Sequence, residues 1–173
     1  MKTFNCLILL AFLGTIAFGQ NTRRWSFSED NGIVWDVKPL SPHNDHIEMS
    51  GLQISAIVGY GVSDSGVLTI NKKLVFPMLR TIPNNTHASL IVDFTKDQPL
   101  QMVVNDTELK EYPKSFGLKG KLIIKSLTNT KLETTHILFP SVDKPSFIEI
   151  INLQNKGNTE ITVNIKKDIY NSG

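Results

Sequence analysis

The densest group of chemically capable side chains in this sequence falls within residues 43–48. Those positions hold two imidazoles, two carboxyl groups and one carboxamide, on His43, Asn44, Asp45, His46 and Glu48. Such groups can transfer protons, ligate metal ions or hydrogen-bond to a polar ligand such as a sugar. We therefore take these residues as candidates for substrate binding or for contact with a second domain.

The spacing of the two histidines and the glutamate forms the pattern H-x2-H-x-E. On an extended strand His46 and Glu48 would share one face with Cα atoms about 6.6 Å apart, close enough to converge on one ion. The pattern matches no established metal-ligand spacing, and we assign no metal and no cofactor. We favour a structural role, in which this polar segment leads into a strand and hydrogen-bonds to neighbouring loops. Contact with a ligand or a partner domain is the next alternative, and metal binding is the least favoured.

A second candidate segment surrounds Arg80. Pro77 and Pro83 bracket it and argue against a regular central strand, because proline cannot donate a ladder hydrogen bond. Arg80 stands among apolar neighbours, where an unpaired guanidinium would be costly, so it requires a carboxylate partner. The candidate partners are Asp45, Glu48 and Asp93. An ion pair that ties two loops together is at least as favoured as binding of an anionic substrate.

The polar turn that follows Arg80 completes the set of candidate binding residues. Asn84, Asn85 and His87 lie close together there and could present amides and an imidazole to sugar hydroxyls. The remaining histidine, His136, stands inside an apolar strand-like segment and is interpreted as a buried, hydrogen-bonded imidazole. The sequence contains no nucleophile motif and no glycine-rich phosphate loop.

Aromatic side chains could provide a stacking surface for pyranose rings. The candidates are Trp25, Trp35, Tyr60, Tyr112 and Tyr170. In a β-sandwich, aromatic rings belong to the core or cover an edge more often than they form an exposed platform. Spacing alone does not distinguish these two arrangements.

The elements that must position these residues are almost all strands. Short segments rich in Val, Ile, Thr and aromatic residues, separated by turn residues, are expected at 33–37, 52–60, 66–70, 89–94, 100–104, 121–126, 132–139, 147–152 and 160–165. Turns are expected at 105–106, 129–130 and 155–158, and the last of these would join the final two strands in a hairpin. This pattern predicts an all-β fold, an antiparallel two-sheet β-sandwich.

Residues 1–19 have the form of a secretory signal peptide, with basic Lys2, an apolar stretch and small residues near Gly19. The stretch is too short for a membrane span. Its removal would take away Cys6, the single cysteine of the sequence, and leave residues 20–173 as one β-sandwich domain in the periplasm or outside the cell. The charges are interspersed and the net charge is only +2, which argues against nucleic acid as a partner.

Three sequence features together resemble a known family. They are Ile33-Val34-Trp35-Asp36-Val37, the segment Pro42-His43-Asn44-Asp45-His46-Ile47-Glu48-Met49-Ser50-Gly51, and Phe76-Pro77-Met78-Leu79-Arg80 followed by Pro83-Asn84-Asn85-Thr86-His87. This combination resembles the N-terminal β-sandwich of secreted bacterial glycoside hydrolases in which an (α/α)6 barrel follows. The resemblance covers most of the chain after the signal peptide.

The resemblance implies a non-catalytic module that packs against the barrel and contributes loops to glycan binding. The family's acid and base carboxylates lie in the barrel, which is absent from this sequence, so we expect the chain alone to be inactive on glycosides. The implied partners are a glycan or an (α/α)6 barrel domain. Two alternatives remain: an independent carbohydrate-binding or adhesion sandwich, and a small metal-dependent enzyme built on His43, His46 and Glu48.

Overall fold

The structure is a computed structural model that describes residues 23–39, 41–80, 89–94 and 100–167. The signal peptide predicted from the sequence lies outside these ranges, as do the candidate residues Asn84, Asn85 and His87. Arg80 is described by its backbone only.

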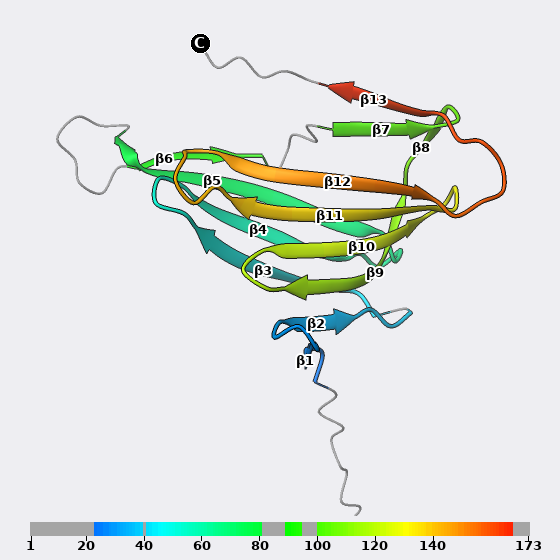
Figure 1. The fold of residues 1–173 in the computed structure, drawn as a ribbon, viewed down its shortest axis with the longest axis horizontal. Coiled ribbons are helices and arrows are strands. Elements are labelled where there is room, and N and C mark those ends of the chain that lie inside the picture. The colour runs from blue at the N-terminus through cyan, green and yellow to red at the C-terminus, as the bar shows by residue number, and fades with distance from the viewer. Residues whose placement is uncertain (1–22, 40, 81–88, 95–99, 168–173) are drawn as a thin grey trace, which may run out of the picture.

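The described residues form thirteen strands and no helix (Figure 1). The strands are β1 (Ser26–Phe27), β2 (Ile33–Asp36), β3 (His43–Ser50), β4 (Ser55–Val62), β5 (Leu68–Arg80), β6 (Ser89–Asp93), β7 (Leu100–Val104), β8 (Thr107–Glu108), β9 (Glu111–Leu118), β10 (Leu122–Thr128), β11 (Leu132–Pro140), β12 (Phe147–Asn155) and β13 (Val163–Lys167). No helix that could cross a membrane occurs in these ranges.

The strands form three sheets, and every strand pair in them is antiparallel. A six-stranded sheet has the order β1-β2-β9-β10-β11-β12, and a four-stranded sheet has the order β3-β4-β5-β6. A smaller sheet with the order β13-β7-β8 accompanies them. The predicted all-β, sandwich-like fold is confirmed, and the third sheet is an addition that the sequence pattern did not predict.

The core lies between the six-stranded and four-stranded sheets. Alternate residues of β4 and β10 point inward, and Val58, Tyr60, Leu122 and Ile124 are buried there together with Phe116 of β9. This alternation follows from the two-residue period of a strand, which places successive side chains on opposite faces. The core therefore fixes which side chains of each strand face outward.

Two expectations about strands near the ends of the chain need correction. The last two strands do not form a hairpin, because β12 pairs with β11, whereas β13 pairs with β7 in the third sheet. The segment before Gly51 is more than a lead into a strand, because residues 43–50 form β3 and pair with β4 along their whole length.

The strand β5 runs further than the predicted strand at 66–70 and continues past Pro77. Its regular pairing with β4 ends at Val75, and its pairing with β6 becomes irregular between Phe76 and Arg80. Pro77 falls within this irregular stretch and beyond the last β4 pair, where a missing N–H group interrupts no regular ladder.

Candidate functional site

The strand β3 divides the five candidate residues between two faces of the four-stranded sheet. His43 and Asp45 are half-buried and point inward, in line with the buried Met49. Asn44, His46 and Glu48 are exposed and point outward. The shared face predicted for His46 and Glu48 is confirmed, and His43 lies on the other side of the sheet.

The inward-facing His43 belongs to an aromatic group. Its ring lies 5.5 Å from the ring of Trp35 in an edge-on arrangement, and Arg24 Nη1 lies 3.0 Å from its Nε2. The Arg24 guanidinium also lies 5.3 Å from the Trp35 ring centre. These contacts hold His43 at the rim of the core, so its imidazole faces away from the outer surface of β3.

Asp45 is paired in register with Tyr60 of β4, on the inner face. Burial, followed by the negative charge of Asp45, raises the pKa of Tyr60 to about 12. Tyr60 is only 2% exposed. Its phenol is therefore a neutral component of the core at physiological pH.

The arrangement of β3 does not assemble the H-x2-H-x-E pattern into one site. His43 is on the inner face, whereas His46 and Glu48 are on the outer face, so the three side chains cannot converge on one ion. Across the described ranges, no group of three or more His, Cys, Asp or Glu residues is arranged to hold a metal ion.

The outward-facing side chains of β3 and of residues 69–73 in β5 are polar, and we call the surface that they form the polar face. It consists of Asn44, His46, Glu48 and Ser50 on β3 and Thr69, Asn71 and Lys73 on β5, with β4 between them. The register aligns these residues in rows across the sheet: Asn44–Gly61–Thr69, His46–Gly59–Asn71 and Glu48–Ile57–Lys73.

Two of these rows have glycine in the central strand, and the glycines leave room for the amides beside them. A Cβ atom at Gly59 would meet the Asn71 carboxamide Oδ1 at 2.5 Å. A Cβ atom at Gly61 would meet the His43 carbonyl oxygen at 2.2 Å and the Asn44 Oδ1 at 2.5 Å. Glycine inside a strand costs stability and often marks a place where another group approaches closely. Here the approaching groups are the two asparagine amides of the polar face.

Some side chains of the polar face are fixed by hydrogen bonds within the sheet. Thr69 Oγ1 donates to Asn44 Oδ1 across Gly61 at 2.8 Å. Lys73 Nζ lies 3.4 Å from the carboxylate of Asp93 on β6. These contacts orient Asn44 and Lys73 without covering them.

Three other side chains of the polar face have no partner in the part of the chain that the structure describes. These are the imidazole of His46, the carboxylate of Glu48 and the carboxamide of Asn71. His46 is fixed through its backbone N–H group, which donates to Asp45 Oδ1 at 2.8 Å. The polar face therefore offers an imidazole, a carboxylate and an amide for hydrogen bonds to a ligand or to another protein surface.

The structure does not test the carboxylate partner expected for Arg80, because the pairing of β5 becomes irregular between Phe76 and Arg80. The side chain of Arg80 lies outside the described residues, so its own partner stays a prediction.

The aromatic candidates that the structure describes belong mainly to the core. Trp35 is 3% exposed and stacks on Phe116 with ring centres 4.6 Å apart. Trp25 is half-buried and packs edge-on against Trp35 and Tyr60. These three rings do not form an exposed platform, which confirms the core interpretation for them. Tyr112 is partly exposed, and Tyr170 lies outside the described residues.

His136 is the centre of a buried ionic network that the sequence pattern did not reveal. It is 4% exposed on β11, and its Nε2 lies 2.9 Å from Glu111 Oε2 of β9. Its Nδ1 lies 3.2 Å from Glu149 Oε1 of β12, and Lys72 Nζ of β5 lies 2.5 Å from Glu149 Oε2. Thr134 Oγ1 also donates to Glu111. The network joins the two large sheets across the core.

The charges in this network balance one another. Burial alone lowers the pKa of His136, but hydrogen bonds to Glu111 and Glu149 and the charges of these carboxylates outweigh it and raise the pKa to about 9. Burial raises the pKa of Glu149, but the hydrogen bond from His136 and the charge of Lys72 outweigh that effect and lower it to about 2. Two cations therefore face two carboxylates at neutral pH, as a buried cluster requires.

Comparison of the chain with models of protein families, with characterised proteins and with solved structures found no match.

Proposed function

We propose that this chain is a non-catalytic β-sandwich module of an exported carbohydrate-active glycoside hydrolase, and that the polar face is its contact surface. The contact would be with a glycan, or with the (α/α)6 barrel domain that carries the catalytic groups. The resemblance of residues 33–37, 42–51 and 76–87 to such modules motivates the assignment of family.

The observation that carries the proposal is the pair of glycine-centred rows on the polar face. Gly59 and Gly61 weaken the central strand β4 yet allow the amides of Asn71 and Asn44 to lie across it. Next to these amides, His46 and Glu48 have no partner among the described residues. The glycines lower the stability of β4, and the polar groups beside them are unpaired in the described residues. This combination fits a contact surface better than it fits a surface that only keeps the protein in solution.

The separation of the local carboxylates supports the non-catalytic part of the proposal. Glycoside hydrolysis generally uses two carboxyl groups on either side of one bond, about 5–5.5 Å or about 6.5–9.5 Å apart. Asp45 and Glu48 are the local pair, and β3 directs them to opposite faces of a sheet. They cannot flank a single glycosidic bond.

The alternatives receive less support. An independent module that stacks sugars on Trp35 and Tyr60 is disfavoured because both rings are buried in the core. A metal enzyme built on His43, His46 and Glu48 is disfavoured because these side chains do not converge.

The contact can be tested by NMR titration of the purified chain with plant oligosaccharides. We expect amide shifts at residues 44–48 and 71–73, and weaker binding after Asn71→Ala. The matched control is Asn152→Ala, since Asn152 is an exposed asparagine on β12 of the other large sheet. Shifts confined to other surfaces, or equal weakening by both substitutions, would contradict glycan contact at the polar face.

A further inference from the structure

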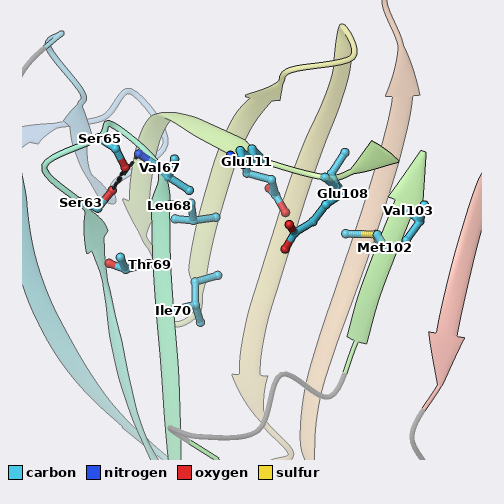
Figure 2. Close-up of a pocket in the computed structure, with 12 residues that line it drawn as sticks. Ser63, Ser65, Val67, Leu68, Thr69, Ile70, Met102, Val103, Glu108 and Glu111 are labelled. Atoms are coloured by element: carbon cyan, nitrogen blue, oxygen red, sulfur yellow. Dashed lines mark hydrogen bonds between the residues drawn. The ribbon is translucent and has the colours of Figure 1, made fainter. Parts of the chain in front are cut away.

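A cleft lies between β5 and the segment from β7 to β9, and Thr69 of the polar face is part of its lining. It encloses about 730 Å³, a volume within the usual range of small-molecule sites. Its walls come from the β4–β5 turn, from β5 and from residues 102–111 (Figure 2).

The lining of the cleft combines apolar side chains with two carboxylates. Leu68 and Ile70 line it from β5, and Met102 lines it from β7. Figure 2 shows the carboxylates of Glu108 and Glu111 pointing toward one another, with Leu68 and Ile70 on one side of them and Met102 on the other. A ligand in the cleft would therefore meet negative charge between hydrocarbon surfaces.

The Glu111 carboxylate is held in place from behind by the buried ionic network. It accepts hydrogen bonds from His136 and from Thr134, and its side chain is 12% exposed. A carboxylate has about four acceptor positions, and these contacts leave part of that capacity open. Glu111 therefore belongs to both the interior network and the cleft.

Glu108 differs from Glu111 because its carboxylate is exposed and has no partner in the described ranges. The network already contains equal numbers of cations and carboxylates, so it does not neutralise Glu108. Lys110 is the one cation in the lining that the structure describes, and it is exposed on the connection to β9. The lining thus carries two carboxylates and one ammonium group.

The inner surface behind the cleft contains a further polar group without a partner. Ser126 of β10 is 0% exposed, and its hydroxyl has no hydrogen-bond partner within the described residues. It is paired in register with Thr134, the residue that donates to Glu111. A buried hydroxyl without a described partner therefore lies beside the residue that donates to Glu111.

We propose that the cleft binds a cationic group on an apolar stem, an ammonium or a guanidinium, with Glu108 and Glu111 contacting the charge. Leu68, Ile70 and Met102 would contact the stem. A metal ion is less suited, because the described residues contain no group of three metal-ligating side chains. A sugar is less suited, because the described lining contains no aromatic ring on which to stack. The cation could belong to a free amine or to a lysine or arginine side chain of a protein.

The experiment is an NMR titration of the purified chain with 1,5-diaminopentane and, separately, with pentane-1,5-diol as the uncharged analogue. We expect the diamine, and not the diol, to shift amides within residues 63–70 and 102–111. A titration with a short lysine-containing peptide distinguishes the two sources of cation: tighter binding of the peptide indicates a protein side chain, and tighter binding of the diamine a free amine.

Variants make the assignment specific. Glu108→Gln should weaken diamine binding about tenfold, because a charge-assisted hydrogen bond is lost. Lys110→Gln should strengthen binding because a competing cation is removed. Glu29→Gln, which makes the same change at an exposed site outside the cleft, should leave affinity unchanged. Equal binding of diol and diamine, unchanged binding in Glu108→Gln, or shifts confined to other residues would overturn the proposal.

Discussion

The imidazole of His136 should make the stability of this protein fall as pH rises through the weakly alkaline range. The pKa of His136 is about 9 in the folded protein, against an ordinary value of 6.5. A group whose pKa is raised on folding stabilises the folded state fully below its ordinary pKa. That contribution is lost as pH rises through the folded pKa, because the folded state then releases its extra proton.

The magnitude follows from the size of the shift. A pKa difference of one between the folded and unfolded states corresponds to about 1.36 kcal/mol, so the raised pKa of His136 corresponds to about 3 kcal/mol of unfolding free energy. Solvent screening reduces this free-energy contribution only slightly, because the His136 side chain is only 6% exposed. We therefore expect wild-type stability to fall by about 3 kcal/mol from this group between pH 6 and pH 10.

The assay is urea unfolding followed by tryptophan fluorescence at several pH values between 6 and 10, for wild type and for His136→Gln. The variant should be less stable at pH 6, and the difference from wild type should shrink as pH rises. His46→Gln is the matched control, since it makes the same change at an exposed imidazole and should leave the pH profile of wild type intact. A constant difference between His136→Gln and wild type across this range would show that the protonation of His136 is not linked to folding.

Three further outcomes are expected. Glu149→Gln should lower the unfolding free energy by about 3 kcal/mol near neutral pH, as measured by urea unfolding. The folded pKa of Glu149 is about 2 against an ordinary 4.5, so this deficit should disappear as acidification protonates Glu149 in the wild type. A deficit that persists at the lowest pH would contradict this expectation. Gly61→Ala should lower the unfolding free energy by about 1–3 kcal/mol, which is more than Gly59→Ala should. The Cβ added at Gly61 meets the backbone oxygen of His43, whereas the Cβ added at Gly59 meets the movable side chain of Asn71. Equal costs would show that the sheet relaxes at both sites. Exported protein should begin at Gln20 or Asn21 by intact mass, and a mass that retains residues 1–19 would rule out the predicted cleavage.

Strand positions were predictable wherever apolar alternation was regular and turn residues were present. The predicted strand 100–104 corresponds to β7, and Asn105 and Asp106 in the turn after it adopt the positive φ angles expected of a tight hairpin. The strand β9 escaped prediction because Pro113 and Gly117 interrupt its pattern. Pro113 is tolerated because it lies outside the pairing of β9 with β2, which begins at Ser115.

The interior charges were less predictable than the strands. The strand at 147–152 was predicted, but its sequence does not tell which face is buried. Glu149 points inward and Ile150 is exposed, the reverse of what hydrophobicity suggests. The reason is tertiary: Lys72 and His136, from two other strands, supply the charges that make a buried carboxylate tolerable.

The outer face of β3 could be predicted in part. The two-residue period correctly placed His46 and Glu48 together. Asn71, Gly59 and Gly61 were missed because their role depends on the register between β3, β4 and β5, which one sequence does not reveal. A glycine repeated two positions apart in an apolar strand was the one available signal for a polar surface that crosses it.

Incubation of the purified chain with aryl glycosides and plant oligosaccharides, followed by measurement of released product, tests whether this chain is a non-catalytic module. We expect no turnover, because Asp45 and Glu48 point to opposite faces of the sheet. Turnover that Glu48→Gln abolishes while the protein remains folded would instead show that the polar face is an active site.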